Sequence, residues 1–152
     1  MGKITPFLWF DDNAEEAMNF YLSVFKDGEV GSIMPGPGGK AMSVTFTLRG
    51  QEFMALNAGP MYTFNEAVSF FVSCDTQEEV DDLWSKLTAD GGEESRCGWL
   101  KDKFGLSWQI IPKALGEYLG AEDREKAGRA IQAMMGMKKI EVAELKRAFD
   151  GE

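Results

Sequence analysis

The pattern of apolar and polar positions occurs twice along the chain. Residues 7–10 form an apolar, aromatic-rich run, and across residues 14–25 apolar side chains recur at the three- and four-residue spacing of a helix. Residues 70–74 and the stretch 80–87 follow the same order. A constant offset aligns Phe7 with Phe70, Asp12 with Asp75, and Tyr21 with Trp84. The sequence therefore predicts a duplicated strand–helix unit, with any ligand site expected between the two halves.

Further strands are predicted after each helix. Alternation and bounding turn residues indicate strands at residues 29–34, 42–48, 52–57, 94–99 and 106–111. In the second of these, Val44, Phe46 and Leu48 face one side of the strand, and the intervening polar residues face the other. Residues 35–39 contain only Pro and Gly and predict a loop.

The helix starts carry capping signals. Asp12 is expected to cap the first helix, with Glu15 three residues further on, which is the spacing of a capping box. Thr76 or Asp75 is expected to cap the second. Each cap would mark the point where a strand passes into its helix.

The last part of the chain is helical in pattern and lies outside the duplication. We expect an α+β domain at residues 1–112, made of two βαβββ repeats at about 3–58 and 66–112, and a helical extension at 113–152. The Met-rich faces of this extension are predicted to pack on the domain or on a second subunit, and they comprise Met134, Met135 and Met137.

Composition restricts the function classes. The net charge of −9 disfavours nucleic acid and anionic membrane surfaces as partners, because both attract basic proteins. The chain has no His, which removes the usual proton shuttle and the commonest transition-metal ligand. Its two cysteines, Cys74 and Cys97, are expected to be buried free thiols. No membrane segment or signal sequence is apparent, and a cytoplasmic location is expected.

Several motifs occur together in the order found in one family. They occupy residues 4–10, 55–60, 64–67, 97–109 and 132–140. With these motifs the chain resembles the PhnB-like family, often labelled demethylubiquinone methyltransferase-like, of the vicinal oxygen chelate superfamily that includes glyoxalase I and the bleomycin-resistance proteins. The resemblance covers nearly the whole chain. It implies two βαβββ repeats that form a curved sheet around a cup, and a homodimer.

The methyltransferase label finds no support in the residues. A nucleotide-type methyl donor usually sits at a Gly-rich turn between a strand and a helix of a parallel sheet. Residues 11–13, which follow the first strand, are Asp-Asp-Asn instead. We therefore expect no cofactor.

The resemblance also implies where metal ligands would stand. In metal-dependent members of the superfamily, four ligands line the cup, and three of these positions correspond here to Pro6, Ser69 and Gln109. The remaining position, which is the second in chain order, falls between Met54 and Leu56. These residues supply neither carboxylate nor imidazole, the donors that such cations prefer, so no bound metal is expected.

A cup with a polar floor and aromatic walls then remains. The candidate ligand-binding residues are Thr45, Ser69, Gln109, Phe10, Phe71 and Trp99, and Glu66 is the candidate acid or base. The alternative for the polar residues is that they satisfy buried hydrogen bonds, and for Glu66 that it is a solvated carboxylate at a strand end. The favoured function is metal-free binding of a small molecule. The alternatives are a lyase, isomerase or dioxygenase of unknown substrate, and a protein-interaction module.

Overall fold

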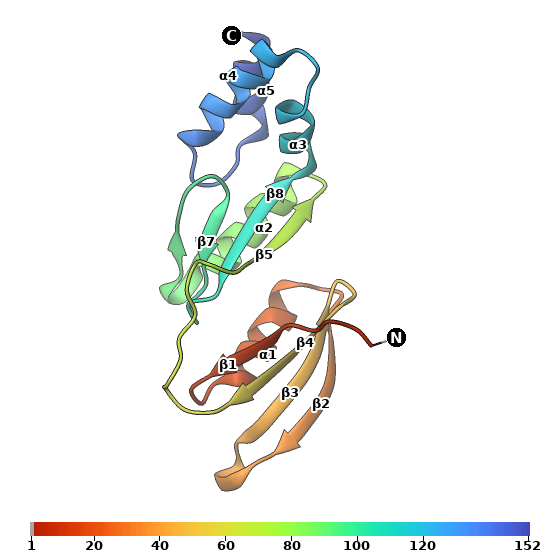
Figure 1. The fold of residues 1–152 in the computed structure, drawn as a ribbon, viewed down its shortest axis with the longest axis vertical. Helices are drawn as coiled ribbons and strands as arrows, with labels where there is room; N and C mark the ends of the chain where they lie inside the picture. Colours follow the sequence, from red (N-terminus) through yellow and green to blue (C-terminus); the bar gives the residue numbers. More distant parts are fainter. Residues whose placement is uncertain (1) are drawn as a thin grey trace. The chain divides into compact units, whose positions relative to one another are not determined.

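The computed structural model describes residues 2–152 and consists of two units, each built on one sheet (Figure 1). The first unit ends at Phe64, and the second spans Asn65–Glu152. Each contains a four-stranded sheet and a helix that follows the first strand. This arrangement confirms the predicted α+β class and the duplication.

The first unit follows the order that the pattern predicts. Its elements are β1 (Phe7–Phe10), α1 (Ala14–Val24), β2 (Glu29–Pro35), a 3₁₀ turn (Pro37–Gly39), β3 (Ala41–Leu48) and β4 (Gln51–Asn57). The strand order is β1-β4-β3-β2, with β1 parallel to β4 and the remaining pairs antiparallel. The predicted loop at residues 35–39 therefore contains one short helical turn.

Alternation along β3 builds the core of this unit. Val44, Phe46 and Leu48 lie on one face of the strand, as predicted, and are buried, whereas the residues between them are half-buried. The Phe46 ring stacks on Phe53 at 5.4 Å and faces Tyr21 of α1 at 6.2 Å between centroids. Full burial of a side chain of this size contributes about 2 kcal/mol to stability.

The start of α1 differs from the prediction. Asp12 does not cap the helix; the residue at the cap position is Asn13, whose side chain makes no capping bond. The backbone N–H of Ala14 instead donates to Oδ1 of Asn57 at 2.8 Å, and Nδ2 of Asn57 donates to the carbonyl of Ala41. Asp12 pairs with Lys40 at 2.9 Å. A strand residue remote in sequence thus replaces the local cap.

The second unit repeats the topology and adds three helices. Its elements are β5 (Ser69–Cys74), α2 (Gln77–Thr88), a 3₁₀ turn (Ala89–Gly91), β6 (Glu93–Glu94), β7 (Trp99–Lys101), β8 (Ser107–Pro112), α3 (Lys113–Leu119), α4 (Arg124–Met135) and α5 (Val142–Asp150). The strand order β5-β8-β7-β6 matches that of the first unit, with β5 parallel to β8. At α2 the predicted cap is confirmed, because Oγ1 of Thr76 accepts from the N–H of Glu79 at 3.2 Å.

The constant offset predicted between the copies fails in the first strands. Leu8 and Phe10 are buried in β1, and Val72 and Cys74 are buried at the equivalent positions of β5. The offset between equivalent residues is therefore one residue larger in the strands than in the helices. The cause is the connection to the helix, which has residues 11–13 in the first copy but only residues 75–76 in the second. In the first strands, Phe7 is therefore equivalent to Phe71 and not to Phe70.

The predicted strand at residues 94–99 is interrupted. Between β6 and β7 the backbone turns through positive φ at Cys97 (57°) and Gly98 (87°). Their N–H groups donate to the carbonyls of Met137 and Lys138, both at 2.8 Å. The connector between α4 and α5 therefore supplies hydrogen bonds to this part of the chain. A Cβ on Gly98 would lie 2.6 Å from Cδ1 of Ile111, so a larger residue would not fit without movement.

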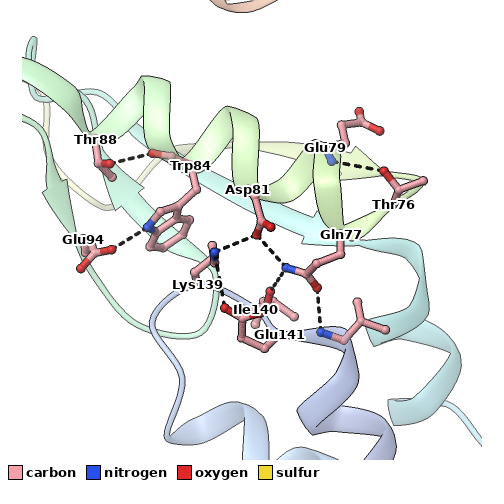
Figure 2. A network of polar contacts seen from close by, with 11 residues as sticks. Thr76, Gln77, Glu79, Asp81, Trp84, Thr88, Glu94, Lys139, Ile140 and Glu141 are labelled. Carbon is pink, nitrogen blue, oxygen red and sulfur yellow. Dashed lines mark hydrogen bonds and ion pairs between the residues drawn. The ribbon is translucent and has the colours of Figure 1, made fainter.

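Polar side chains hold the same connector against α2 (Figure 2). Nε2 of Gln77 donates to the carbonyl of Ile140 at 2.9 Å, and its Oε1 accepts from the N–H of Val142 at 2.8 Å. Lys139 lies 2.7 Å from Asp81, and this hydrogen bond lowers the pKa of the Asp81 carboxyl. We call residues 137–142 the tail clamp.

The C-terminal helices pack on the second repeat through a second hydrophobic cluster. It consists of Ile111, Leu115, Ala130, Met137, Ile140 and Leu145. Of the three methionines that the sequence singles out, Met137 is buried here, Met134 packs at its edge and Met135 is exposed. The helices of residues 113–152 thus share a unit with the second repeat. Within residues 2–152 no helix is both long and apolar enough to span a membrane.

Candidate functional site

One face of the second sheet gathers most of the predicted site residues. The residues on this face are Ser69 and Phe71 of β5, Ser107 and Gln109 of β8, and Trp99 and Lys101 of β7. The alternate positions Val72, Trp108 and Ile110 are buried on the opposite face. We call the first set the open face of the second sheet. The predicted orientation of Ser69 and Gln109 is confirmed, since Nε2 of Gln109 donates to Oγ of Ser69 at 3.0 Å.

The other two predicted ligand-binding residues lie in the first unit. Phe10 is buried, with its ring edge against Phe64 at 5.3 Å. The hydroxyl of Thr45 accepts from the N–H of Ser32 at 2.8 Å and lies 3.0 Å from the Ser32 hydroxyl. Both side chains therefore have partners within their own unit. Their predicted role in ligand binding stays a prediction.

A pocket of about 140 Å³ lies along the open face at β6 and β7. It is lined by Glu66, Glu93, Glu94, Ser95, Trp99, Leu100, Lys101 and Ser107. Glu66, the candidate acid or base, forms an ion pair with Lys101 at this pocket. The hydrogen bond from Lys101 lowers the pKa of the exposed Glu66 carboxyl. A general base that acts near neutral pH needs a raised carboxyl pKa, so this environment does not tune Glu66 for proton transfer.

Ser107 is a site residue that the sequence reasoning missed. It is 1% exposed, and its Oγ is buried without a hydrogen-bond partner among residues 2–152. The signal was available, because Ser107 precedes Gln109 by two positions on a predicted strand and so shares its face.

Asp102, another buried polar residue, has a structural role. Its Oδ1 accepts from the N–H groups of Phe104 and Leu106 at 2.8 and 3.1 Å, and its Oδ2 accepts from Nε1 of Trp108 at 2.9 Å. The carboxylate thus holds together the turn between β7 and β8. It fixes the strands that carry the open face.

The residues at the metal-ligand positions do not suit a divalent cation. The one-residue shift between the first strands makes Thr5, rather than Pro6, the counterpart of Ser69. Strand register makes Met54 the counterpart of Gln109, because Met54 pairs with Phe7 as Gln109 pairs with Phe71. Two hydroxyls, a thioether and an amide offer neither carboxylate nor imidazole. Across residues 2–152 no three His, Cys, Asp or Glu side chains cluster closely enough to hold an ion.

The protein-family model described as 3-demethylubiquinone-9 3-methyltransferase matches residues 2–111. The chain belongs to this PhnB-like family. A structure described as a putative 3-demethylubiquinone-9 3-methyltransferase, PhnB protein, from Bacillus cereus is 40% identical, with a TM-score of 0.68; the match covers 73% of this chain and 99% of that one. No curated protein matches the chain.

More distant structures share the fold. Protein PA1353 from Pseudomonas aeruginosa is 22% identical with a TM-score of 0.62, and the match covers 74% of this chain and 98% of that one. The fosfomycin resistance protein FosX from Listeria monocytogenes, determined with Mn(II) and sulfate, is 16% identical with a TM-score of 0.57; the match covers 78% and 95% of the two chains. These neighbours confirm the glyoxalase-type fold.

The family name does not match the architecture expected for a nucleotide-type methyl donor. Each sheet of this PhnB-like chain is mixed, with one parallel pair. The connection from β1 to α1 consists of Asp11, Asp12 and Asn13 and lacks the glycines that let a backbone approach a phosphate. The residues present do not fit such a donor.

Proposed function

We propose that this PhnB-like protein binds a small organic molecule on the open face of its second sheet, without a resident divalent metal. The observation that carries the proposal is the Gln109–Ser69 hydrogen bond, flanked by Trp99 and Phe71 on the same face. Neutral hydrogen-bonding groups beside aromatic surface are typical of sites for small organic ligands.

The exposure of the aromatic residues supports this role. Phe71 is 61% exposed although it lies in the middle of a strand, whereas its neighbour Val72 is buried. An exposed aromatic ring next to a neutral polar pair offers a surface on which a planar or aliphatic ligand can pack. Trp99 stands directly across from Gln109 in the antiparallel pair of β7 and β8.

In the first unit, Thr45 remains a candidate for ligand binding, whereas Phe10 is buried with the core side chains Leu8 and Phe46 on the other face of its sheet. The protein is further proposed to act as a cytoplasmic homodimer. The light-scattering mass should then be close to twice the 16.9 kDa of one chain. A monomer at micromolar concentration would contradict the dimer while leaving the ligand face intact.

The test is a screen of small organic compounds by ligand-observed NMR, on protein purified without chelator and analysed for metal. Gln109→Ala and Ser69→Ala should each weaken binding of a hit about tenfold, the effect of losing one hydrogen bond to a ligand. Gln51→Ala and Ser85→Ala, at exposed positions elsewhere, are matched controls and should leave affinity unchanged.

Two results would overturn the proposal. The first is one tightly held divalent ion per chain whose removal abolishes binding. The second is a hit whose affinity is the same in the Gln109 and Ser69 variants as in the unaltered protein.

A further inference from the structure

The pocket at β6 and β7 carries an excess of negative charge. Glu66, Glu93 and Glu94 line it with Lys101, and Glu93 pairs with Lys101 across β6 and β7, whereas Glu94 pairs with Leu100 and its carboxylate turns toward α2. The carboxylates of Glu66 and Glu93 therefore outnumber the single ammonium group of Lys101. Lys138 approaches Glu94 only at 3.9 Å, and one oxygen of Glu94 also accepts from Nε1 of Trp84 at 2.7 Å. The lining therefore attracts a cation more strongly than an anion.

Ser107, whose buried hydroxyl has no hydrogen-bond partner among residues 2–152, is one of the residues that line the same pocket. Ser107 lines it from β8, directly across from Lys101 of β7. A buried polar atom without a hydrogen-bond partner is rare in folded proteins and requires an explanation. A ligand N–H group in the pocket would donate to Oγ of Ser107 and supply the missing bond.

We propose that this pocket binds the ammonium group of a small primary amine, as a subsite of the ligand face proposed above. The ammonium group of the ligand donates to Ser107 and to the Glu66 carboxylate. In the complex it replaces the ammonium group of Lys101 as the ion-pair partner of Glu66. Trp99, which also lines the pocket, stabilises the positive charge through its aromatic face. The inference rests on the proposed function and specifies the chemistry of one end of the ligand.

The size of the pocket limits what enters it. A volume of about 140 Å³ holds an amino group with a few carbon atoms but not a whole drug-sized molecule, which fills at least about 300 Å³. The remainder of a larger ligand would then lie over Gln109 and Phe71, on the same face of the sheet.

Three probes of nearly equal shape, one cationic, one neutral and one anionic, test which ligand charge the pocket prefers. Propylamine, 1-propanol and propionate are titrated into the protein, and binding is followed by the indole N–H resonances of its four tryptophans. Trp99→Phe assigns the relevant signal. Propylammonium should shift the Trp99 resonance in a saturable manner, 1-propanol at least tenfold more weakly, and propionate not at all.

Two variants test the contacts. Ser107→Ala removes only the hydroxyl, and Glu66→Gln removes the charge at an exposed position where folding is not at risk; each should weaken propylammonium binding about tenfold. Ser85→Ala and Glu117→Gln, exposed on α2 and α3, are the matched controls and should leave it unchanged.

The outcomes separate this inference from the wider proposal. Propionate binding as strongly as propylammonium, or propylammonium binding that both variants retain, overturns the amine subsite. A neutral hit that depends on Gln109 but not on Ser107 overturns the subsite and upholds the ligand face. Propylammonium binding that is lost in Ser107→Ala and kept in Gln109→Ala supports the subsite and counts against the wider face.

Discussion

The two repeats share a strand order but complete their sheets differently. In the first, β2 and β3 are seven and eight residues long and pair with each other. In the second, the equivalent strands β6 and β7 have only two and three residues. The tail clamp supplies hydrogen bonds where the second hairpin is short. The comparison teaches that a duplicated unit can lose strand length when backbone from elsewhere in the chain replaces it.

The helix starts differ in the same way. Asn57, from β4, satisfies the first N–H of α1, so the first repeat uses a remote side chain. In the second repeat, Thr76 and Glu79 form a local cap, and Gln77 is free to bind the tail clamp. In the first repeat the helix start is thus bonded to a strand of its own sheet, whereas in the second repeat it is bonded to the segment that leads into α5.

The largest effect is expected from Ile140→Ala. Ile140 is fully buried in the tail clamp, and its truncation should lower the free energy of unfolding by about 3 kcal/mol, through lost burial and the cavity left behind. Urea denaturation measures the change. Met135→Ala, at an exposed position on α4, is the control and should change stability by less than about 0.5 kcal/mol. An Ile140→Ala protein as stable as the control would show that the second repeat does not depend on the clamp.

Asn57→Ala tests the remote cap of the first repeat. It removes the acceptor for Ala14 and the donor to Ala41, and it should cost about 2 kcal/mol of stability. Asn19→Ala, at an exposed position of α1, is the matched control and should be neutral or slightly stabilising. Equal urea midpoints for the two variants would contradict the cap.

Thr76→Ala tests the local cap of the second repeat. Loss of the bond to Glu79 should cost about 1 kcal/mol, less than Asn57→Ala, because the neighbouring backbone stays exposed to water. The comparison uses the same urea assay. A cost greater than that of Asn57→Ala would reverse the order proposed for the two caps.

The smallest effect is a pH dependence at the tail clamp. The pKa of Asp81 is lowered from 3.8, first by its hydrogen bond with Lys139, so this carboxylate stabilises the fold above pH 3.8 and the contribution is lost as pH falls through the lowered value. Asp81→Asn should remove about 0.3 kcal/mol at pH 7, since the pair is half exposed. The difference in stability between the two proteins should shrink below pH 4. A difference that stays constant between pH 7 and pH 3 would contradict the assignment.

The pattern of apolar and polar residues predicted those features of the fold that depend only on residues close together in the sequence. The alternation of β3 and the shared face of Ser69 and Gln109 followed from strand geometry alone. The predicted cap of α1 and the predicted continuous strand at residues 94–99 were wrong. In both places, residues far away in the sequence, Asn57 and the tail clamp, make the hydrogen bonds. No window of the sequence contains both partners of such contacts.

The candidate site was predicted in part for the same reason. Strand alternation predicted that Ser69 and Gln109 share one face, and the strand register adds Phe71 and Trp99 to it. The lack of a partner for Ser107 among residues 2–152 depends on every neighbouring donor and acceptor, which only the three-dimensional structure shows. The Glu66–Lys101 pair likewise joins a loop residue to a strand residue that pattern alone does not bring together.

The tail clamp also bears on how the protein is made. The bond between Gln77 and Val142 joins residues 65 positions apart, so the second repeat cannot reach its final form until residue 142 has left the ribosome. All four strands of the first sheet lie before Phe64, so its strand pairs are available earlier in synthesis. Synthesis from the N-terminus therefore lets the first repeat fold early, while the repeat that carries the proposed ligand face waits for the start of α5.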